Sequence, residues 1–132
     1  MKITADTNVL VRAIVLDDAI QTRAAEHELD GAELVALTLP ALCEFVWVLS
    51  SNYKLAYSDI AAAVRKLLDA GNVAADRAAV DAGLAMLDDG GDFADGVIAD
   101  AGKWLGAETF VSFDKRAVRL LRARGEAARP PK

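Results

Sequence analysis

The sequence contains very few of the residues that build disulfides, zinc sites or histidine-based catalytic centres. Among its 132 residues there are one cysteine, Cys43, and one histidine, His27. A single cysteine cannot form an internal disulfide or a zinc-binding cluster. His27 lies in a charged segment that predicts a surface position, so a Ser-His-Asp or Cys-His centre is not expected. Cys43 lies in an apolar run and is expected to be a buried, reduced thiol, which favours a cytoplasmic protein.

The sequence predicts neither a membrane span nor a leader, and it contains no phosphate-binding loop motif. The apolar stretch from Leu34 to Tyr53 contains Pro40 and Glu44 and ends in polar residues, so it does not predict a membrane span. The chain reaches Asp6 almost at once, which is not typical of a signal peptide. No G-x-x-x-x-G-K-[ST] motif is present, so a nucleotide-binding loop of that type is excluded.

What the sequence does contain is typical of one globular domain. Hydrophobic residues make up 54% and charged residues 27% of the chain, and 132 residues suffice for a substantial core. The net charge is −5, yet seven basic residues and one acid lie between Lys115 and Lys132. An acidic body argues against broad nucleic-acid binding through charge alone. The basic tail, from about residue 124, either contacts phosphates or is a flexible, solvated end, and the second interpretation is favoured.

Strand-like and helix-like segments alternate along the chain, which predicts an α/β fold with a mainly parallel sheet covered on both faces. The expected strands are Lys2–Asp6, Leu34–Leu37, Asn72–Ala75 and Thr109–Phe113. The expected helices are Val9–Val15, Asp18–Leu29, Thr38–Asn52, Asp59–Asp69, Arg77–Leu87, Phe93–Leu105 and Lys115–Arg124. Their expected capping residues are Asp17 or Asp18, Thr38, Ser58, Asp92 and Asp114.

Four acidic residues fall where this fold would place a ligand. Asp6 lies at the end of one predicted strand, Asp114 directly follows another, Asp95 lies in the first turn of a helix, and Glu44 lies about one turn into another helix. Because ligands of parallel sheets bind at the carboxyl ends of the strands, all four acids are expected to face one edge.

Each of these acids also has a simpler explanation. Asp6 and Asp114 are good helix caps, and Asp92 with Asp95 resembles a capping box. Glu44 is the unusual one, since it is the only charge between Glu33 and Lys54. It falls about 200° from Leu42 on a helical wheel, outside the core stripe. A favourable helix-dipole position or an ion pair with a distant arginine would explain it equally well.

The four acids together indicate a cation. Like charges about 4 Å apart repel by about 4 kcal/mol, so the cluster needs protons or a metal. Oxygen ligands suit Mg²⁺ or Mn²⁺, and such a site activates water for attack on a phosphodiester. The residues therefore predict metal-assisted phosphodiester hydrolysis.

Four segments of the chain resemble PIN-domain ribonucleases, and in particular the VapC toxins of bacterial toxin–antitoxin pairs. These segments are "ADTNVLVRAIVLDD" (Ala5 to Asp18), "LPALCEFVWVLSSNY" (Leu39 to Tyr53), "DFADGVIADAG" (Asp92 to Gly102) and "ETFVSFDKRA" (Glu108 to Ala117). Their order and spacing cover nearly the whole chain. The resemblance implies a single α/β/α sandwich over residues 1–132.

The resemblance also implies a function and a site. It implies a Mg²⁺- or Mn²⁺-dependent endoribonuclease that cuts structured RNA, is neutralised by a cognate antitoxin and forms a homodimer. Asp6, Glu44, Asp95 and Asp114 match the catalytic acids, with Asp6 and Asp95 as metal ligands. Thr7 and Asn8 match a polar pair that positions water or substrate, and Asp92 and Asp100 are accessory candidates.

Three alternatives stay open on the residues alone. A phosphoacceptor receiver domain needs an acidic pair after its first strand, where Thr7 and Asn8 stand. A phosphatase with Asp6 as nucleophile needs a second aspartate at position 8. A catalytically silent PIN-like binding protein is disfavoured by the four intact acids. The candidates for holding RNA are Arg12, Lys103, Lys115, Arg116 and the tail, with Trp47 and Trp104 for stacking.

Overall fold

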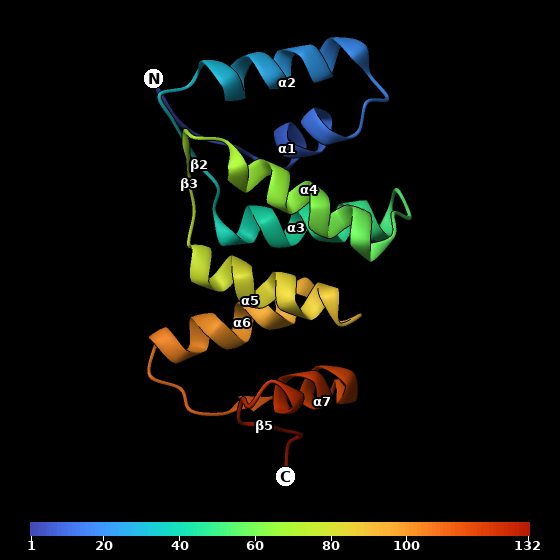
Figure 1. The fold of residues 1–132 in the computed structure, drawn as a ribbon, viewed down its shortest axis with the longest axis vertical. Helices are drawn as coiled ribbons and strands as arrows, with labels where there is room; N and C mark the ends of the chain where they lie inside the picture. The colour runs from blue at the N-terminus through green and yellow to red at the C-terminus, as the bar shows by residue number, and fades with distance from the viewer. The chain divides into compact units, whose positions relative to one another are not determined.

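A computed structural model describes every residue from 1 to 132 and contains seven helices and five short strands (Figure 1). In chain order the elements are β1 (Lys2–Thr4), α1 (Thr7–Ile14), α2 (Ala19–Gly31), β2 (Leu34–Ala36), α3 (Leu39–Ser51), α4 (Tyr57–Asp69), β3 (Val73–Ala74), α5 (Arg77–Asp88), α6 (Phe93–Trp104), β4 (Phe110–Val111), α7 (Lys115–Ala123) and β5 (Ala128–Arg129). None of the helices combines the length and apolar character needed to cross a membrane.

The chain forms two compact units, and the first covers Met1–Asp76. Its three strands form a parallel sheet in the order β1-β2-β3, with Ile3 opposite Val35 and Val35 opposite Val73. Helix α1 packs against α2 and α3, and α3 packs against α4. Residues from this sheet and these helices, among them Leu10 and Phe45, are fully buried. The short strands therefore lie beside a much larger helical core.

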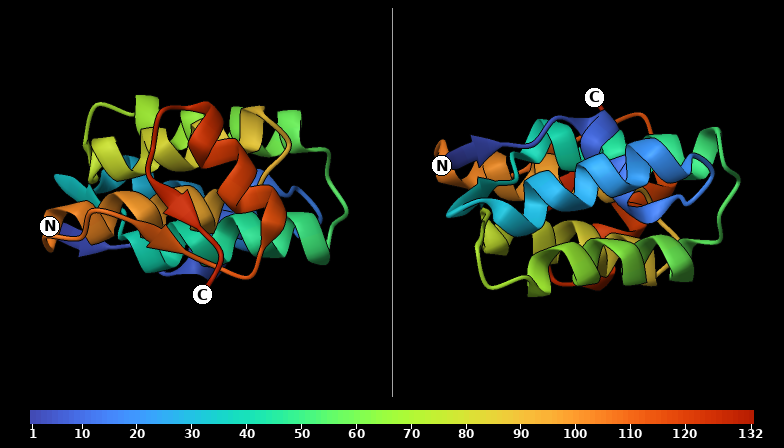
Figure 2. Two further views of the ribbon diagram at one scale, coloured as in Figure 1. Left: turned by 90° about the horizontal axis from the view of Figure 1, so that it is seen from below. Right: turned by 90° about the horizontal axis from the view of Figure 1, so that it is seen from above.

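The second unit covers Arg77–Lys132. Helices α5 and α6 lie side by side in it (Figure 1), and a glycine allows their close approach. A Cβ on Gly96 of α6 would lie only 2.3 Å from the Ala82 carbonyl oxygen of α5. Strands β4 and β5 pair in parallel next to α7, as the orange and red segments of Figure 2 show. Met86, Val118 and Leu121 are buried in this unit's own core.

The α/β class and the parallel pairing of the strands are confirmed. The caps at Asp18, Thr38, Asp92 and Asp114 are confirmed as well, because each side chain accepts a hydrogen bond from a backbone N–H of its helix. The Ser58 cap is wrong: α4 begins two residues earlier than predicted, after Ala56, which offers no side-chain cap.

The sequence does not predict strand β5. It predicts a flexible tail after the last helix, whereas Ala128 and Arg129 pair with β4. Ala128 is buried, and its carbonyl oxygen accepts a hydrogen bond from Arg122 Nε at 2.7 Å. The chain after α7 is therefore held to the second unit by a strand and a side chain.

Candidate active site

Asp6 lies just after β1, which ends at Thr4, and caps α1. Its Oδ1 accepts a hydrogen bond from the Thr7 N–H at 2.8 Å, which confirms the capping role. The side chain is exposed, and it forms no ion pair. One carboxylate oxygen thus serves the helix, and the other is available to a ligand.

Thr7 and Asn8, the predicted positioning pair, lie in different environments. Thr7 is buried, and its hydroxyl donates to the Ala41 carbonyl oxygen at 3.3 Å. This bond ties the start of α1 to the first turn of α3. Asn8 is exposed on the next position of α1. Thr7 thereby fixes the element that carries Asp6 against the element that carries Glu44.

Glu44 lies on an exposed face of α3. It has neither a hydrogen bond nor an ion pair, and it lies beyond the first helical turn. Trp47, on the same face, is 62% exposed. The large apolar neighbours of Glu44 in the sequence therefore do not enclose it, and this face of α3 is open. Neither an arginine partner nor a first-turn position explains the carboxylate.

Asp6 and Glu44 line the same surface hollows of the first unit. One hollow of about 350 Å³ includes Asp6, Asn8 and Glu44 among its lining residues, and a neighbouring one of about 310 Å³ again includes Asp6 and Glu44. The carboxylates come from elements separated by more than 30 residues, joined through the Thr7 contact to Ala41. The structure thus brings two of the four predicted acids together in this unit.

The second unit carries the other two acids. Asp92 caps α6 by accepting from the Ala94 N–H at 3.1 Å. Asp95, three residues on, makes no hydrogen bond, so the second half of the expected capping box is not formed. Asp95 is half-buried in the first turn of α6. Its carboxylate is therefore not used to complete the helix.

Asp95 is electrostatically perturbed by its surroundings. Burial, followed by the negative charges of Asp92 and Asp114, raises the pKa of Asp95 from 3.8 to about 6. Asp114 caps α7 through the Arg116 and Ala117 N–H groups, at 3.0 and 3.1 Å from its Oδ1. The three acids thus form a cluster in which adding charge is unfavourable. Perturbed acids of this kind are common at functional sites.

The donor set of these acids fits a divalent cation. None of Asp6, Glu44, Asp95 and Asp114 is paired with a basic side chain, and each retains a carboxylate oxygen without a hydrogen-bond partner. Mg²⁺ takes one or two carboxylates directly and keeps several waters. Within each unit, no three acidic, histidine or cysteine side chains are arranged to hold a metal by themselves.

Asp100, the remaining accessory candidate, differs from the others. One of its carboxylate oxygens, Oδ2, is buried without a hydrogen-bond partner. No protein donor lies within hydrogen-bonding distance of that atom. Its proposed accessory role remains a prediction.

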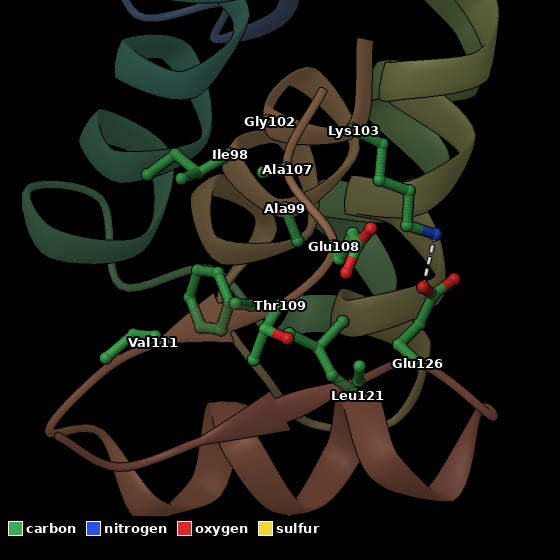
Figure 3. Close-up of a pocket in the computed structure, with 12 residues that line it drawn as sticks. Ile98, Ala99, Gly102, Lys103, Ala107, Glu108, Thr109, Val111, Leu121 and Glu126 are labelled. Atoms are coloured by element: carbon green, nitrogen blue, oxygen red, sulfur yellow. Dashed lines mark ion pairs between the residues drawn. The ribbon is translucent and has the colours of Figure 1, made fainter. Parts of the chain in front are cut away.

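Most of the basic residues considered for RNA binding already have partners. Arg12 forms an ion pair with Asp17 at 2.7 Å, and Arg116 donates to the Gly90 carbonyl oxygen at 2.9 Å. Lys103 pairs with Glu126, as the dashed line in Figure 3 shows. Lys115 is exposed and has no hydrogen bond or ion pair.

Figure 3 also shows that the Lys103–Glu126 pair lies at a hollow of the second unit. The hollow has a volume of about 190 Å³ and is bounded by α6, β4 and α7. Ile98, Ala99 and Leu121 give it a largely apolar lining. No predicted site acid lines it.

Phe113 is an exposed aromatic residue that the sequence does not indicate as a candidate for binding. The sequence assigns it to the end of a strand, but β4 ends at Val111 and Phe113 is 85% exposed. Trp47 and Trp104 are also exposed, so neither is a core residue. His27 is exposed as expected, and Cys43 is half-buried and forms no disulfide.

Comparison with protein families finds a match over most of the chain. The family model described as the PIN domain matches residues 3–123. A search of curated proteins finds no match to the chain.

Proposed function

The chain belongs to the PIN domain family, and from that premise we propose that it is a metal-dependent endoribonuclease. PIN domains are generally nucleases and usually use a divalent metal, commonly Mg²⁺. The observation that carries the proposal is the set of carboxylates left without basic partners: Asp6 and Glu44 in one hollow, and Asp95 in a like-charged cluster with Asp114.

Each acid has a role in this proposal. Asp6 and Asp95 hold Mg²⁺ or Mn²⁺, while Glu44 and Asp114 complete the acidic site and orient the attacking water. A bound divalent ion supplies a lowered pKa for that water and charge stabilisation at the phosphate. Asn8 is exposed beside Asp6 and positions water or substrate. Thr7 supports this arrangement through its bond to Ala41.

The biological role that we propose is that of a VapC-type toxin. The support is the resemblance of four segments that together carry all four acids, including "ADTNVL" with Asp6 and "DFADG" with Asp95. The substrate is then RNA, and a cognate antitoxin protein neutralises the enzyme. We further propose a homodimer as the state in solution.

Cleavage of an RNA pool by the purified protein tests the enzymatic proposal. We expect cleavage with Mg²⁺ or Mn²⁺, none with EDTA, and a loss of at least about 100-fold in Asp6→Asn, since removing one charge-stabilising group has effects of that size. Asp30→Asn, an exposed acid on α2, is the matched control and should cleave like the wild type. Equal cleavage by every sample, including those with EDTA, would reject the metal-dependent nuclease.

Controlled expression in a bacterial host tests the toxin role separately. Wild-type protein should arrest growth, and Asp6→Asn at the same protein level should not. Cleavage in vitro without any growth arrest would leave the nuclease in place and contradict the toxin assignment.

A further inference from the structure

The turn between β4 and α7 displays an aromatic side chain beside an acid of the proposed site. Phe113 is 85% exposed, whereas phenylalanine is among the residue types most often buried. It directly precedes Asp114, whose charge acts on Asp95. The Ser112 Oγ accepts a hydrogen bond from the Asp114 N–H at 3.0 Å. This short turn therefore places an accessible ring next to the proposed catalytic acids.

Two cations with no partner lie on the helix that follows. Helix α7 contains four basic residues, and two of them are engaged: Arg116 with the Gly90 carbonyl oxygen and Arg122 with the Ala128 carbonyl oxygen. Lys115 and Arg119 are exposed and make no hydrogen bond or ion pair. They are four residues apart, so they lie on one face of α7, about 6 Å apart along its axis.

We propose that Phe113, Lys115 and Arg119 form a nucleotide-holding surface, in which the ring stacks on an unpaired base and the two cations contact neighbouring phosphates. This inference rests on the proposed function and deepens it, because it names the element that offsets the repulsion between RNA and an acidic protein. Base stacking on an aromatic side chain tolerates any sequence, and phosphate contacts supply affinity that depends on salt.

The chemistry around Phe113 favours RNA over a protein partner. The centres of protein interfaces are depleted of charged residues, whereas Phe113 is followed at once by Asp114 and Lys115. An exposed ring next to free cations matches an anionic strand that carries flat bases. A base inside a duplex is already stacked on its neighbours, so only an unpaired nucleotide offers its face to the ring.

RNA binding measured by fluorescence anisotropy tests this surface. The probe is a fluorescein-labelled single-stranded RNA of mixed sequence, with the same sequence as a duplex for comparison. All variants carry Asp6→Asn so that the RNA stays intact. We expect the single strand to bind more tightly than the duplex.

Phe113→Ala should weaken single-strand binding about 5- to 100-fold, while Phe113→Trp should retain it. Phe113→Leu should behave like the alanine variant, because leucine keeps apolar contact but cannot stack. Leu105→Ala is the matched control, because it removes another large apolar side chain of the same unit, one that is 90% exposed at the end of α6. It should bind like the Asp6→Asn parent.

Lys115→Gln combined with Arg119→Gln should lower the slope of log affinity against log salt by about 1.4, which corresponds to two phosphate contacts on a single strand. Lys2→Gln combined with Arg23→Gln removes two exposed cations of the first unit and should leave the slope unchanged.

Unchanged RNA binding by Phe113→Ala and by the Lys115/Arg119 double variant would overturn the inference, as would a parent protein that does not bind the RNA. If Phe113→Ala instead reduced only self-association in sedimentation, Phe113 would belong to a protein interface. Failure of the nuclease proposal is recognised separately. In that case the wild-type protein, which keeps Asp6, would bind the RNA but would not cut it with Mg²⁺. If wild-type protein cuts RNA while Phe113→Ala binds the RNA as tightly as the Asp6→Asn parent, only the inference fails.

Discussion

At the scale of single residues, the proposed site is a set of caps and free carboxylates. Asp6 and Asp114 each use one oxygen to cap the N-terminus of a helix, which is the simple explanation that their sequence positions suggest. Asp95 and Glu44 serve no cap and no ion pair, so the simple explanations fail for them. These two residues are therefore the more informative members of the site.

The perturbed Asp95 predicts a pH dependence of stability. Its pKa is raised from 3.8 to about 6 in the folded protein, so the folded state binds more protons than the unfolded chain between these values. The free energy of unfolding of the metal-free protein should therefore fall as pH rises from about 4 to 6. Asp95→Asn cannot titrate, and its stability relative to the wild type should rise over the same window.

Urea unfolding of both proteins in EDTA, followed by circular dichroism between pH 4 and 7, measures this difference. Parallel stability curves for the two proteins would contradict the assignment. A stability advantage of Asp95→Asn over the wild type that grew toward acid pH would contradict it even more directly, because it would require a lowered pKa of Asp95.

At the scale of elements, the packing of α5 against α6 positions Asp95. Gly96 follows Asp95 directly and lies against the backbone of α5, where a Cβ would be 2.3 Å from the Ala82 carbonyl oxygen. A backbone atom cannot rotate away as a side chain can. The close approach of the two helices therefore depends on glycine at this position.

Gly96→Ala should destabilise the protein by about 1–3 kcal/mol, the usual cost of overpacking. Gly31→Ala is the matched control, because nothing lies within 4 Å of the Cβ that it would add at the end of α2. Its effect should be neutral or slightly stabilising. Thermal unfolding measures both variants, and equal melting temperatures for the two would contradict the tight α5–α6 contact.

The elements also show which parts of the fold are predictable from the sequence. Helices and their caps depend on neighbouring residues, so Asp18, Thr38, Asp92 and Asp114 are identified correctly. Strand β5 depends on pairing with β4, which no local pattern of Ala128 and Arg129 reveals. In the same way, the exposure of Glu44 depends on how α3 packs against other elements. The apolar residues next to Glu44 in the sequence would by themselves suggest that it is buried.

At the scale of the whole molecule, the proposed acids come from both compact units. Asp6 and Glu44 belong to Met1–Asp76, whereas Asp95 and Asp114 belong to Arg77–Lys132. The PIN domain match runs from residue 3 to 123 and therefore includes residues of both. The central claim is that Asp6 and Asp95 bind one divalent ion, and this claim can be tested without any RNA.

The most direct test is the melting temperature of wild type, Asp6→Asn and Asp95→Asn during a Mg²⁺ titration. A ligand that binds only the folded state raises stability with its concentration. We predict a rise that saturates in the wild type and is lost in both variants, because each removes a ligand of the same ion. An equal rise in all three proteins, or its loss in only one variant, would contradict a metal site shared by Asp6 and Asp95.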